Sequence, residues 1–288
     1  MGLSILVTGA AGSVGRRVCK ILLERGHSVR AFDIPAADFA DLASQEAVEV
    51  VRGDIRDGPL VTAAASGCDW VLHLAAILPP ASEANRERTL SVNVDGTRVL
   101  LDSLAQGQKR PPLVFASTVA TYGDTSTASA PLAADYPQHP LDTYGESKMR
   151  AEGLLLARDY PVAILRIGGV AVAEFLEPPD PWPFTADQRM EFVLREDLAL
   201  ALANAVDNSA VVGHTLNIAG GRAWQLHGAE YVAGIYRAFG VPAEEASFSA
   251  RPGPYDWYDT ALSQALLDYQ HTSYGEFVAR LADIAAAL

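Results

Sequence analysis

A tyrosine and a lysine four residues apart are the side chains of this sequence best suited to proton transfer. Tyr144 and Lys148 stand in the stretch Tyr-Gly-Glu-Ser-Lys, at the start of a predicted helix over about residues 145–157. Residues at positions i and i+4 share a helix face. An ammonium group beside a phenol favours the phenolate and lowers its pKa from about 10. Tyr144 is therefore a candidate general acid/base, and Lys148 a candidate partner for a cofactor ribose.

A hydroxyl pair precedes this helix along the chain. Ser117 and Thr118 follow a predicted strand over residues 113–116, and a hydroxyl there can bind the same substrate oxygen as Tyr144. An isolated Tyr-x-x-x-Lys spacing is often only an ordinary helix face. Its interpretation therefore depends on the rest of the chain.

Three glycines connect the first predicted strand to the first predicted helix. The turn over residues 8–15 reads Thr-Gly-Ala-Ala-Gly-Ser-Val-Gly. Its glycines permit a tight turn, a close approach to a pyrophosphate, and close packing of the helix on the strand. The helix N-terminus offers N–H groups to phosphates. The turn therefore predicts dinucleotide binding, through Gly9, Ala11, Gly12, Ser13, Val14 and Gly15.

Two acidic residues indicate which dinucleotide binds. Asp33 ends the second predicted strand, where its carboxylate can accept hydrogen bonds from the adenosine ribose and repel a 2′-phosphate. No arginine directly follows it, so NAD is favoured over NADP. Asp54 follows the third strand and is placed to accept from the adenine amino group, with Ile55 packing on the ring.

All these residues lie at the ends of predicted elements of one sheet. Short apolar runs, typical of strands buried on both faces of a parallel sheet, occur at residues 3–7, 28–32, 48–51, 70–74, 113–116 and 162–166. Helical patterns separate them, including a long one over about 84–106. This alternation predicts a doubly wound (Rossmann) α/β sheet.

The chain divides into two expected parts. Residues 1–170 form the dinucleotide-binding core with the Tyr/Lys helix. Residues 171–288 form a small substrate-binding cap, with a returning strand near 215–218 and helices near 197–206, 229–239 and 273–287. Two long loops, 121–142 and 171–189, are expected to carry substrate contacts.

Composition excludes several classes of protein. The 288 residues are 49% apolar and 20% charged, which is typical of a globular protein. With 35 acidic against 22 basic residues, the net charge is −13, so neither nucleic acid nor a membrane surface is an expected partner. No run approaches the roughly 18 apolar residues of a membrane span.

The remaining compositional signals indicate a cytoplasmic protein without a metal. Cys19 and Cys68 lack metal-ligand spacing and are expected to be free thiols in a reducing compartment. The first strand begins almost at once, with no pattern of a signal peptide before it. The histidines are scattered without ligand spacing, so no metal is inferred.

Together these motifs resemble the extended short-chain dehydrogenase/reductase family, in particular its NAD-dependent epimerase/dehydratase branch. The matching segments run in family order over about residues 1–170. They are 8–15, Asp33, 53–54, 73–76, 93–97, 117–118, 122–123 and 144–148.

The resemblance implies roles for further residues. Thr118, which stands four residues before Tyr122, joins Tyr144 and Lys148 as the catalytic set in place of Ser117. His73 becomes a scaffold residue. Further cofactor contacts are implied at Leu74, Ala75, Ala76, Asn93 and Ile167, and substrate contacts at Ile77, Gly168, Thr118 and Tyr144. A homodimer through the long helices is also expected, with Met149, Leu154, Leu155 and Leu156 as candidate contacts.

Departures from the family pattern narrow the chemistry. Val119 and Ala120 replace the Asp-Glu pair that 4,6-dehydratases carry after the catalytic threonine. Gly168 and Gly169 follow Arg166-Ile167 without the asparagine by which nucleotide-sugar epimerases help hold the diphosphate. Arg166-Ile167-Gly168 resembles the uronate dehydrogenase subgroup, although the later sequence does not follow it closely. The segment up to Arg189 is short, which implies a small substrate.

The sequence thus predicts an NAD-dependent oxidoreductase acting on a secondary alcohol or ketone of a small polar molecule, such as a sugar or sugar acid. An NAD-dependent epimerase with no net redox change is the main alternative. A non-enzymatic NAD-sensing protein is a minor one, against which the Tyr/Lys pair argues. Arg189 is a candidate partner for a substrate carboxylate or phosphate, and equally a plain surface arginine.

Overall fold

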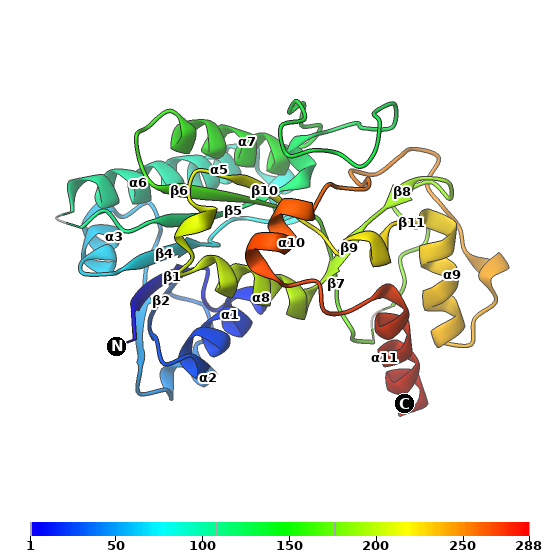
Figure 1. The fold of residues 1–288 in the computed structure, drawn as a ribbon, viewed down its shortest axis with the longest axis horizontal. Coiled ribbons are helices and arrows are strands. Elements are labelled where there is room, and N and C mark those ends of the chain that lie inside the picture. Colours follow the sequence, from blue (N-terminus) through cyan, green and yellow to red (C-terminus); the bar gives the residue numbers. More distant parts are fainter. Residues whose placement is uncertain (1, 108, 176, 288) are drawn as a thin grey trace.

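A seven-stranded parallel sheet forms the centre of the computed structural model, which describes residues 2–107, 109–175 and 177–287 (Figure 1). The strand order is β3-β2-β1-β4-β5-β6-β10, and every neighbouring pair is parallel. The strands are β1 (Ser4–Thr8), β2 (Ser28–Asp33), β3 (Val48–Arg52), β4 (Trp70–His73), β5 (Leu113–Thr118), β6 (Val162–Ile167) and β10 (Thr215–Ile218). This confirms the predicted doubly wound sheet.

Helices cover both faces of the sheet (Figure 1). One face carries α1 (Ser13–Glu24), α2 (Ala40–Ala43), α8 (Arg195–Ala205) and α10 (Ala261–Leu267). The other carries α3 (Gly58–Ala65), α4 (Ala81–Ala84), α5 (Arg86–Leu90), α6 (Gly96–Gln106) and α7 (Thr143–Leu156). Alternate strand residues enter two apolar cores: Val7 and Leu72 pack toward α1 and α8, whereas Leu6 and Phe115 pack toward α6 and α7.

The long helix expected over about 84–106 is present over 86–106, with one π-helical turn inside it. Asn85 separates α4 from α5 in an extended conformation, and its side chain accepts a hydrogen bond from the Arg88 N–H. A π-helical turn over Ser91–Asp95 then precedes α6. The Asn85 side chain takes the Arg88 N–H and so ends α4 before α5 begins. The π turn rotates Asn93 relative to its direction in a regular α-helix.

The C-terminal part completes the sheet and adds a cap. It supplies β10 and α8, and also two short strand pairs: β7 (Gly169–Ala171) with β9 (Phe192–Leu194), and β8 (Arg189–Met190) with β11 (Leu226–His227). The helices α9 (Gly228–Ala238) and α11 (Tyr274–Ala286) lie beyond the sheet (Figure 1). An aromatic core that includes Trp182, Phe184 and Trp224 holds the cap together.

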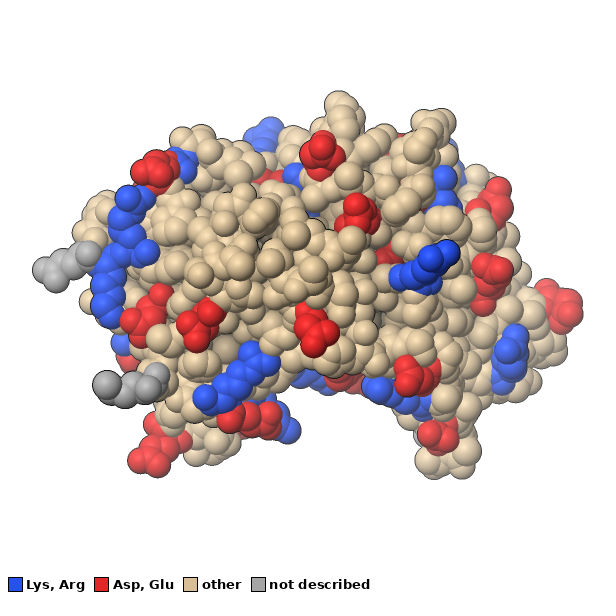
Figure 2. All heavy atoms as spheres, in the orientation of Figure 1, with Lys and Arg blue, Asp and Glu red and all other residues tan. Residues whose placement is uncertain are grey.

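Charges are dispersed over the surface. On the face drawn in Figure 2, acidic and basic side chains alternate around a wide uncharged area. Within residues 2–107, 109–175 and 177–287, no helix is both long and apolar enough to cross a membrane.

Candidate active site

The glycine turn lies where the strand order reverses, between β1 and β4. Gly9 has a φ of +74°, and a Cβ there would stand 2.8 Å from the backbone nitrogen of Ala75 in the loop after β4. At Gly15 a Cβ would stand 2.2 Å from the Gly9 oxygen. Any side chain at either position would therefore push the two loops or the helix apart. The carboxyl ends of β1 and β4 thus form the crevice in which α/β folds bind their ligands.

The residues of this crevice fit a dinucleotide. Gly12 and Ser13 are exposed at the N-terminus of α1, whose first N–H groups have no helical acceptor. Asp33 lies at the end of β2, beside this helix end. Its Oδ2 accepts a hydrogen bond from the Ala11 N–H at 3.0 Å, and its Oδ1 accepts one from the Ile34 N–H at 2.8 Å. The carboxylate is thereby oriented, and each oxygen keeps a lone pair for a ribose hydroxyl.

The two residues predicted to hold the adenine are placed differently from each other. Asp54 is partly exposed, and the hydrogen bond from the Arg56 side chain lowers its pKa. Ile55 is buried, because its side chain packs directly on Gly96 of α6. Its adenine contact remains a prediction.

His73 ties three elements together beneath the crevice. Its Nδ1 lies 2.6 Å from the Thr8 hydroxyl, and its Nε2 lies 3.0 Å from the Thr97 hydroxyl. The Thr97 hydroxyl donates to the Asn93 carbonyl, which makes the imidazole the donor at Nε2 and the acceptor at Nδ1. Burial lowers the His73 pKa to about 3. The ring is a neutral scaffold, as the resemblance implied.

Asn93 holds the loop that follows β4. Its Oδ1 accepts from the Ile77 N–H at 2.8 Å, while its Nδ2 donates to the Ile77 carbonyl at 3.1 Å and to the Ser147 hydroxyl at 2.9 Å. Both amide hydrogens are therefore used within the protein. Asn93 positions the loop that carries Ala75 and Ala76, and links it to α7.

The two neighbouring hydroxyls at the end of β5 have different partners. The Ser117 hydroxyl donates to Glu152, which is buried in α7 and paired with Arg166. The Thr118 hydroxyl accepts only a backbone hydrogen bond from Ala120, at 3.2 Å, among the contacts of the described residues. Its own hydrogen is free for a substrate oxygen. This difference supports the choice of Thr118 over Ser117.

The electrostatics of Tyr144 and Lys148 differ from expectation. Burial, followed by the Asp142 carboxylate, raises the pKa of Tyr144 instead of lowering it. Burial lowers the pKa of Lys148 to about 7. The Lys148 ammonium donates to the Ala116 carbonyl at 2.7 Å and lies 4.7 Å from the centre of the Phe115 ring. The expected depression of the tyrosine pKa is thus absent, because the lysine is directed to β5 and only partly charged at neutral pH.

A carboxylate that the sequence did not reveal holds the start of α7, the helix that carries Tyr144. Glu83, in α4, accepts hydrogen bonds from the backbone N–H groups of Thr143 and Tyr144, at 3.0 and 3.1 Å. Burial opposes ionisation of Glu83, but these hydrogen bonds prevail and its pKa is lowered. The Asp142 side chain caps Gly145 in the same turn. Both interactions fix the backbone from which Tyr144 projects.

The end of β6 leaves little room for side chains larger than those of its two glycines. A Cβ at Gly169 would stand 2.5 Å from the Phe192 ring, and one at Gly168 would stand 3.3 Å from the Ala219 Cβ. Phe192 fills the space where an asparagine side chain would lie. Ile167 is half-buried beside Thr118, its partner across the sheet.

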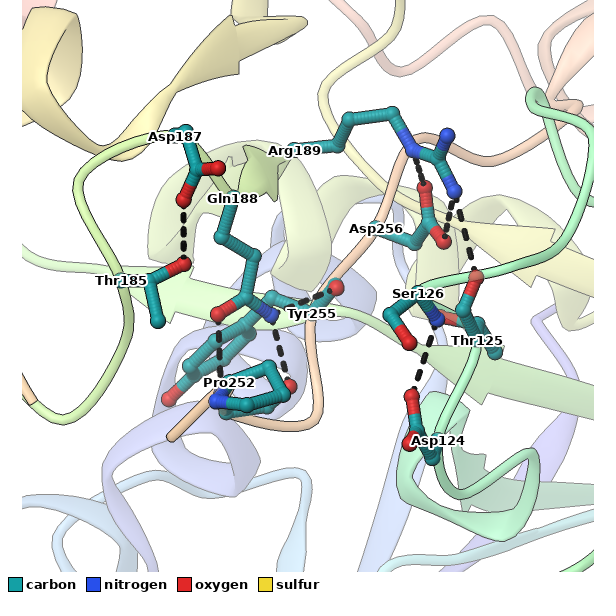
Figure 3. Close-up of a pocket in the computed structure, with 11 residues that line it drawn as sticks. Asp124, Thr125, Ser126, Thr185, Asp187, Gln188, Arg189, Pro252, Tyr255 and Asp256 are labelled. Carbon is teal, nitrogen blue, oxygen red and sulfur yellow. Dashed lines mark hydrogen bonds and ion pairs between the residues drawn. The ribbon is translucent and has the colours of Figure 1, made fainter. Parts of the chain in front are cut away.

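Arg189 binds the protein itself. Its guanidinium pairs with Asp256 through two hydrogen bonds and donates to the Thr125 carbonyl at 3.2 Å (Figure 3). It also donates to the Ala128 carbonyl at 3.0 Å. It is therefore neither the free substrate ligand nor the plain surface arginine that the sequence allowed. The pair borders a polar cavity of about 160 Å³, lined also by Gln188 and Tyr255. Thr118, Tyr144 and Lys148 do not line this cavity.

No group of three or more His, Cys, Asp or Glu side chains within the described ranges is arranged to bind a metal ion. Cys19 and Cys68 are both buried and unpaired with one another.

The arrangement defines a class: a dinucleotide-binding α/β protein with a glycine turn at the switch point of its sheet and a helix that carries Tyr144 and Lys148. A sequence model of the NAD dependent epimerase/dehydratase family matches residues 5–171. The chain therefore belongs to the NAD dependent epimerase/dehydratase family. This confirms the NAD dependent epimerase/dehydratase family expected from the motifs.

Two curated relatives are dehydrogenases. Over 161 residues the chain is 34% identical to a 3-beta-hydroxysteroid dehydrogenase of Mycolicibacterium neoaurum, covering 54% of this chain and 43% of that protein. It is equally identical to a 3 beta-hydroxysteroid dehydrogenase/Delta 5-->4-isomerase of Mycobacterium tuberculosis, covering 54% and 42%. The matched part spans less than half of either relative.

Solved structures share the fold over the whole chain. A short-chain dehydrogenase/reductase superfamily protein from Agrobacterium tumefaciens with bound NAD has a TM-score of 0.82 at 24% identity, covering 99% of this chain and 97% of the other. The UDP-glucuronic acid 4-epimerase of Bacillus cereus in complex with NAD has a TM-score of 0.80 at 23% identity, covering 99% of each chain.

Proposed function

We propose that the protein is an NAD-dependent dehydrogenase acting on a secondary alcohol, or on the corresponding ketone, of a small polar molecule. The observation that carries the proposal is the free hydroxyl of Thr118 at the end of β5, on the strand whose Ala116 carbonyl binds Lys148. Tyr144, one turn before Lys148 on α7, supplies the group that transfers the proton.

Each of these residues has a separate task. Bound NAD supplies the nicotinamide carbon that exchanges a hydride with the substrate. Thr118 donates a hydrogen bond to the substrate oxygen and fixes its direction. Tyr144 moves the hydroxyl proton. Lys148 holds the cofactor ribose. Burial raises the pKa of Tyr144 while Lys148 is directed to the Ala116 carbonyl, so Tyr144 acts as a base only once a protonated Lys148 turns toward the phenol.

Residues around the site oppose two other reactions. Val119 and Ala120 are buried in a 3₁₀ turn after Thr118, so this position carries no acid or base for eliminating water. Gly168 and Gly169 are closed over by Phe192 and Ala219, which leaves no side chain there for a diphosphate. The turn at Val119 and Ala120 and the two glycines after Ile167 therefore favour oxidation of a small substrate over dehydration or nucleotide-sugar chemistry. Epimerisation of another sugar is the second candidate, because the same three residues serve it.

The first experiment follows NADH absorbance with purified protein and excess NAD, while products are analysed in parallel. The panel contains uronates, aldoses, simple alcohols, nucleotide sugars and a 3β-hydroxysteroid. Net NADH with a small polar alcohol is the expected result. Conversion of a sugar with no net NADH would instead establish an epimerase, and NADH formed only with the steroid would overturn the small polar substrate.

Tyr144→Phe tests the role of the tyrosine. It removes the transferable proton and leaves the ring, so turnover is expected to fall at least about a hundredfold. NAD binding, measured by titration calorimetry, is expected to remain within about twofold. A variant that retains full turnover would contradict the assignment.

We further propose that the protein is a cytoplasmic homodimer. Leu156 on α7 is 62% exposed and Leu154 is half-buried, so this helix has apolar area to offer a partner. Leu155 is buried in the core and Met149 is half-buried. The two buried thiols are compatible with a reducing compartment. Size-exclusion chromatography with light scattering, comparing the parent protein with Leu156→Glu, tests the dimer: the variant is expected to be monomeric.

A further inference from the structure

The N-terminus of α1 carries a cation that neither the motif nor the mechanism uses. Arg195, the first residue of α8, lies 182 positions away from Ser13 in sequence, yet its Nη1 donates to the Ser13 hydroxyl at 3.3 Å. Its side chain is 9% exposed. Burial of a guanidinium at the positive end of a helix is unfavourable unless an anion accompanies it.

Helix α1 supplies no such anion itself. Its N-cap residue is Gly12, which has no side chain to cap the helix, and its first turn contains no acidic residue. Arg17 adds a second positive charge nearby. The anions instead come from other elements: Glu174, in the loop after β7, pairs with Arg195, and Glu196 lies 3.5 Å from its Nε.

The guanidinium is incompletely satisfied by these partners. Its buried Nε makes no hydrogen bond with any described residue. Glu174, in turn, is 51% exposed and follows a two-strand ladder of only three residues each. A surface carboxylate of this kind is held weakly, because an exposed ion pair contributes little free energy. Another anion with several oxygens can therefore replace it.

We propose that Arg195 is a ligand of the NAD pyrophosphate, and that Glu174 occupies its guanidinium until the cofactor binds. The site extends the NAD dependence on which the proposed function rests. It takes a diphosphate, because Arg195 reaches the Ser13 hydroxyl at the exposed start of α1, where the first N–H groups of the helix have no helical acceptor. The exchange also releases the loop after β7 from α8 when the cofactor arrives.

The experiment is a set of calorimetric titrations with NAD, ADP-ribose and adenosine. In Arg195→Met, NAD and ADP-ribose are expected to bind about tenfold more weakly or worse, whereas adenosine binds unchanged. Arg195→Lys recovers part of the loss. Glu174→Gln is expected to bind NAD at least about twofold more tightly, because a larger fraction of the protein has a free guanidinium.

The controls separate this site from a merely structural ion pair. Arg158→Met breaks an exposed pair with Asp102 and is expected to leave all three affinities unchanged. Equal weakening of adenosine and ADP-ribose in Arg195→Met, or unchanged NAD binding in Glu174→Gln, would overturn the proposal. Glu174→Gln leaves Arg195 in place, so its NAD affinity tests the proposal even if Arg195→Met does not fold. Binding of NAD by the parent protein is established independently in the same titrations.

Discussion

The side-chain amide of Asn93 binds both backbone groups of Ile77, as a neighbouring strand would. It accepts from the Ile77 N–H and donates to the Ile77 carbonyl, while its second amide hydrogen goes to Ser147 on α7. One side chain thus couples the loop after β4 to the helix that carries Tyr144. The π turn over Ser91–Asp95 is what aims it there.

Replacement of Asn93 is therefore expected to loosen this loop. Asn93→Ala leaves two backbone groups of Ile77 without partners, at a cost of about 1–3 kcal/mol each if they remain buried. Urea unfolding is expected to show a loss of about 2 kcal/mol or more. Asn85→Ala, which removes only an exposed helix cap, is the control and is expected to cost about 1 kcal/mol. Equal losses of stability in Asn93→Ala and Asn85→Ala would show that Asn93 does not couple the loop after β4 to α7.

The different partners of Ser117 and Thr118 predict different defects. Thr118→Val removes a hydroxyl aimed at the substrate and is expected to lower kcat by about tenfold to a hundredfold with little change in stability. Ser117→Ala removes a buried hydrogen bond to Glu152, so it is expected to lower stability by about 1–2 kcal/mol and leave kcat nearly unchanged. Steady-state kinetics and thermal unfolding of both variants test this assignment. If Ser117→Ala loses kcat and Thr118→Val loses stability, the roles of the two residues are exchanged.

Lys148 is expected to make folding stability depend on pH. Its pKa is lowered from 10.5 to about 7 in the folded protein, so the unfolded chain binds more protons between these values. Its contribution to the free energy of unfolding therefore rises as pH increases from about 7 to 10.5, and falls away as pH decreases through 7. Denaturant titrations of the parent and of Lys148→Met across this range measure it. The free energy of unfolding of the parent, relative to that of Lys148→Met, should increase with pH over this range. A relative free energy that does not change with pH would contradict the depressed pKa of Lys148.

The pair of Glu152 and Arg166 is expected to be costly to break. Arg166 donates to both oxygens of Glu152 at 2.7–3.3 Å, also binds the Ala134 carbonyl, and stacks 4.9 Å from the Tyr122 ring centre. Glu152→Gln leaves a buried, unpaired guanidinium, which costs about 3–5 kcal/mol. A second change, Arg166→Met in the Glu152→Gln background, should restore much of the stability. If urea unfolding shows that the stability loss of the double variant is the sum of the losses of the two single variants, Glu152 and Arg166 are not coupled.

Asp33 is expected to set the cofactor preference. Asp33→Ala removes the carboxylate that opposes a 2′-phosphate, so the ratio of kcat/KM for NAD to that for NADP should fall about tenfold or more. The comparison needs no knowledge of the natural substrate beyond one that turns over. Binding titrations with both cofactors give the same ratio independently. An unchanged ratio would place cofactor selection elsewhere.

Most of the sheet could be predicted from the sequence. Its strands are buried on both sides, so they appear as short apolar runs, and all seven lie within two residues of their expected positions. No bounds were predicted for the helices α2, α3, α4 and α10 or for the strands β7 to β9 and β11. These pieces have too few residues to display a period, and the short strands pair over distances that no local pattern encodes.

The site divides in the same way. Thr118, Tyr144 and Lys148 follow local spacings, and the structure places them at adjoining element ends. Glu83 lies 60 residues from the helix start that it holds, and its type alone gives no sign of that contact. The pKa values were also beyond the sequence, because burial, which raises that of Tyr144 and lowers that of Lys148, is a property of the assembled protein.

The contacts of the Arg189 guanidinium limit how the loops of this protein can be redesigned. One guanidinium joins three separate stretches of chain, at Thr125 and Ala128, at β8, and at Asp256. Exchanging any one of these stretches with that of a relative would leave a charge or a carbonyl group without its partner in the other two. New loops can therefore be grafted onto this scaffold only as a matched set of three, and natural drift in one of them is restrained by the other two.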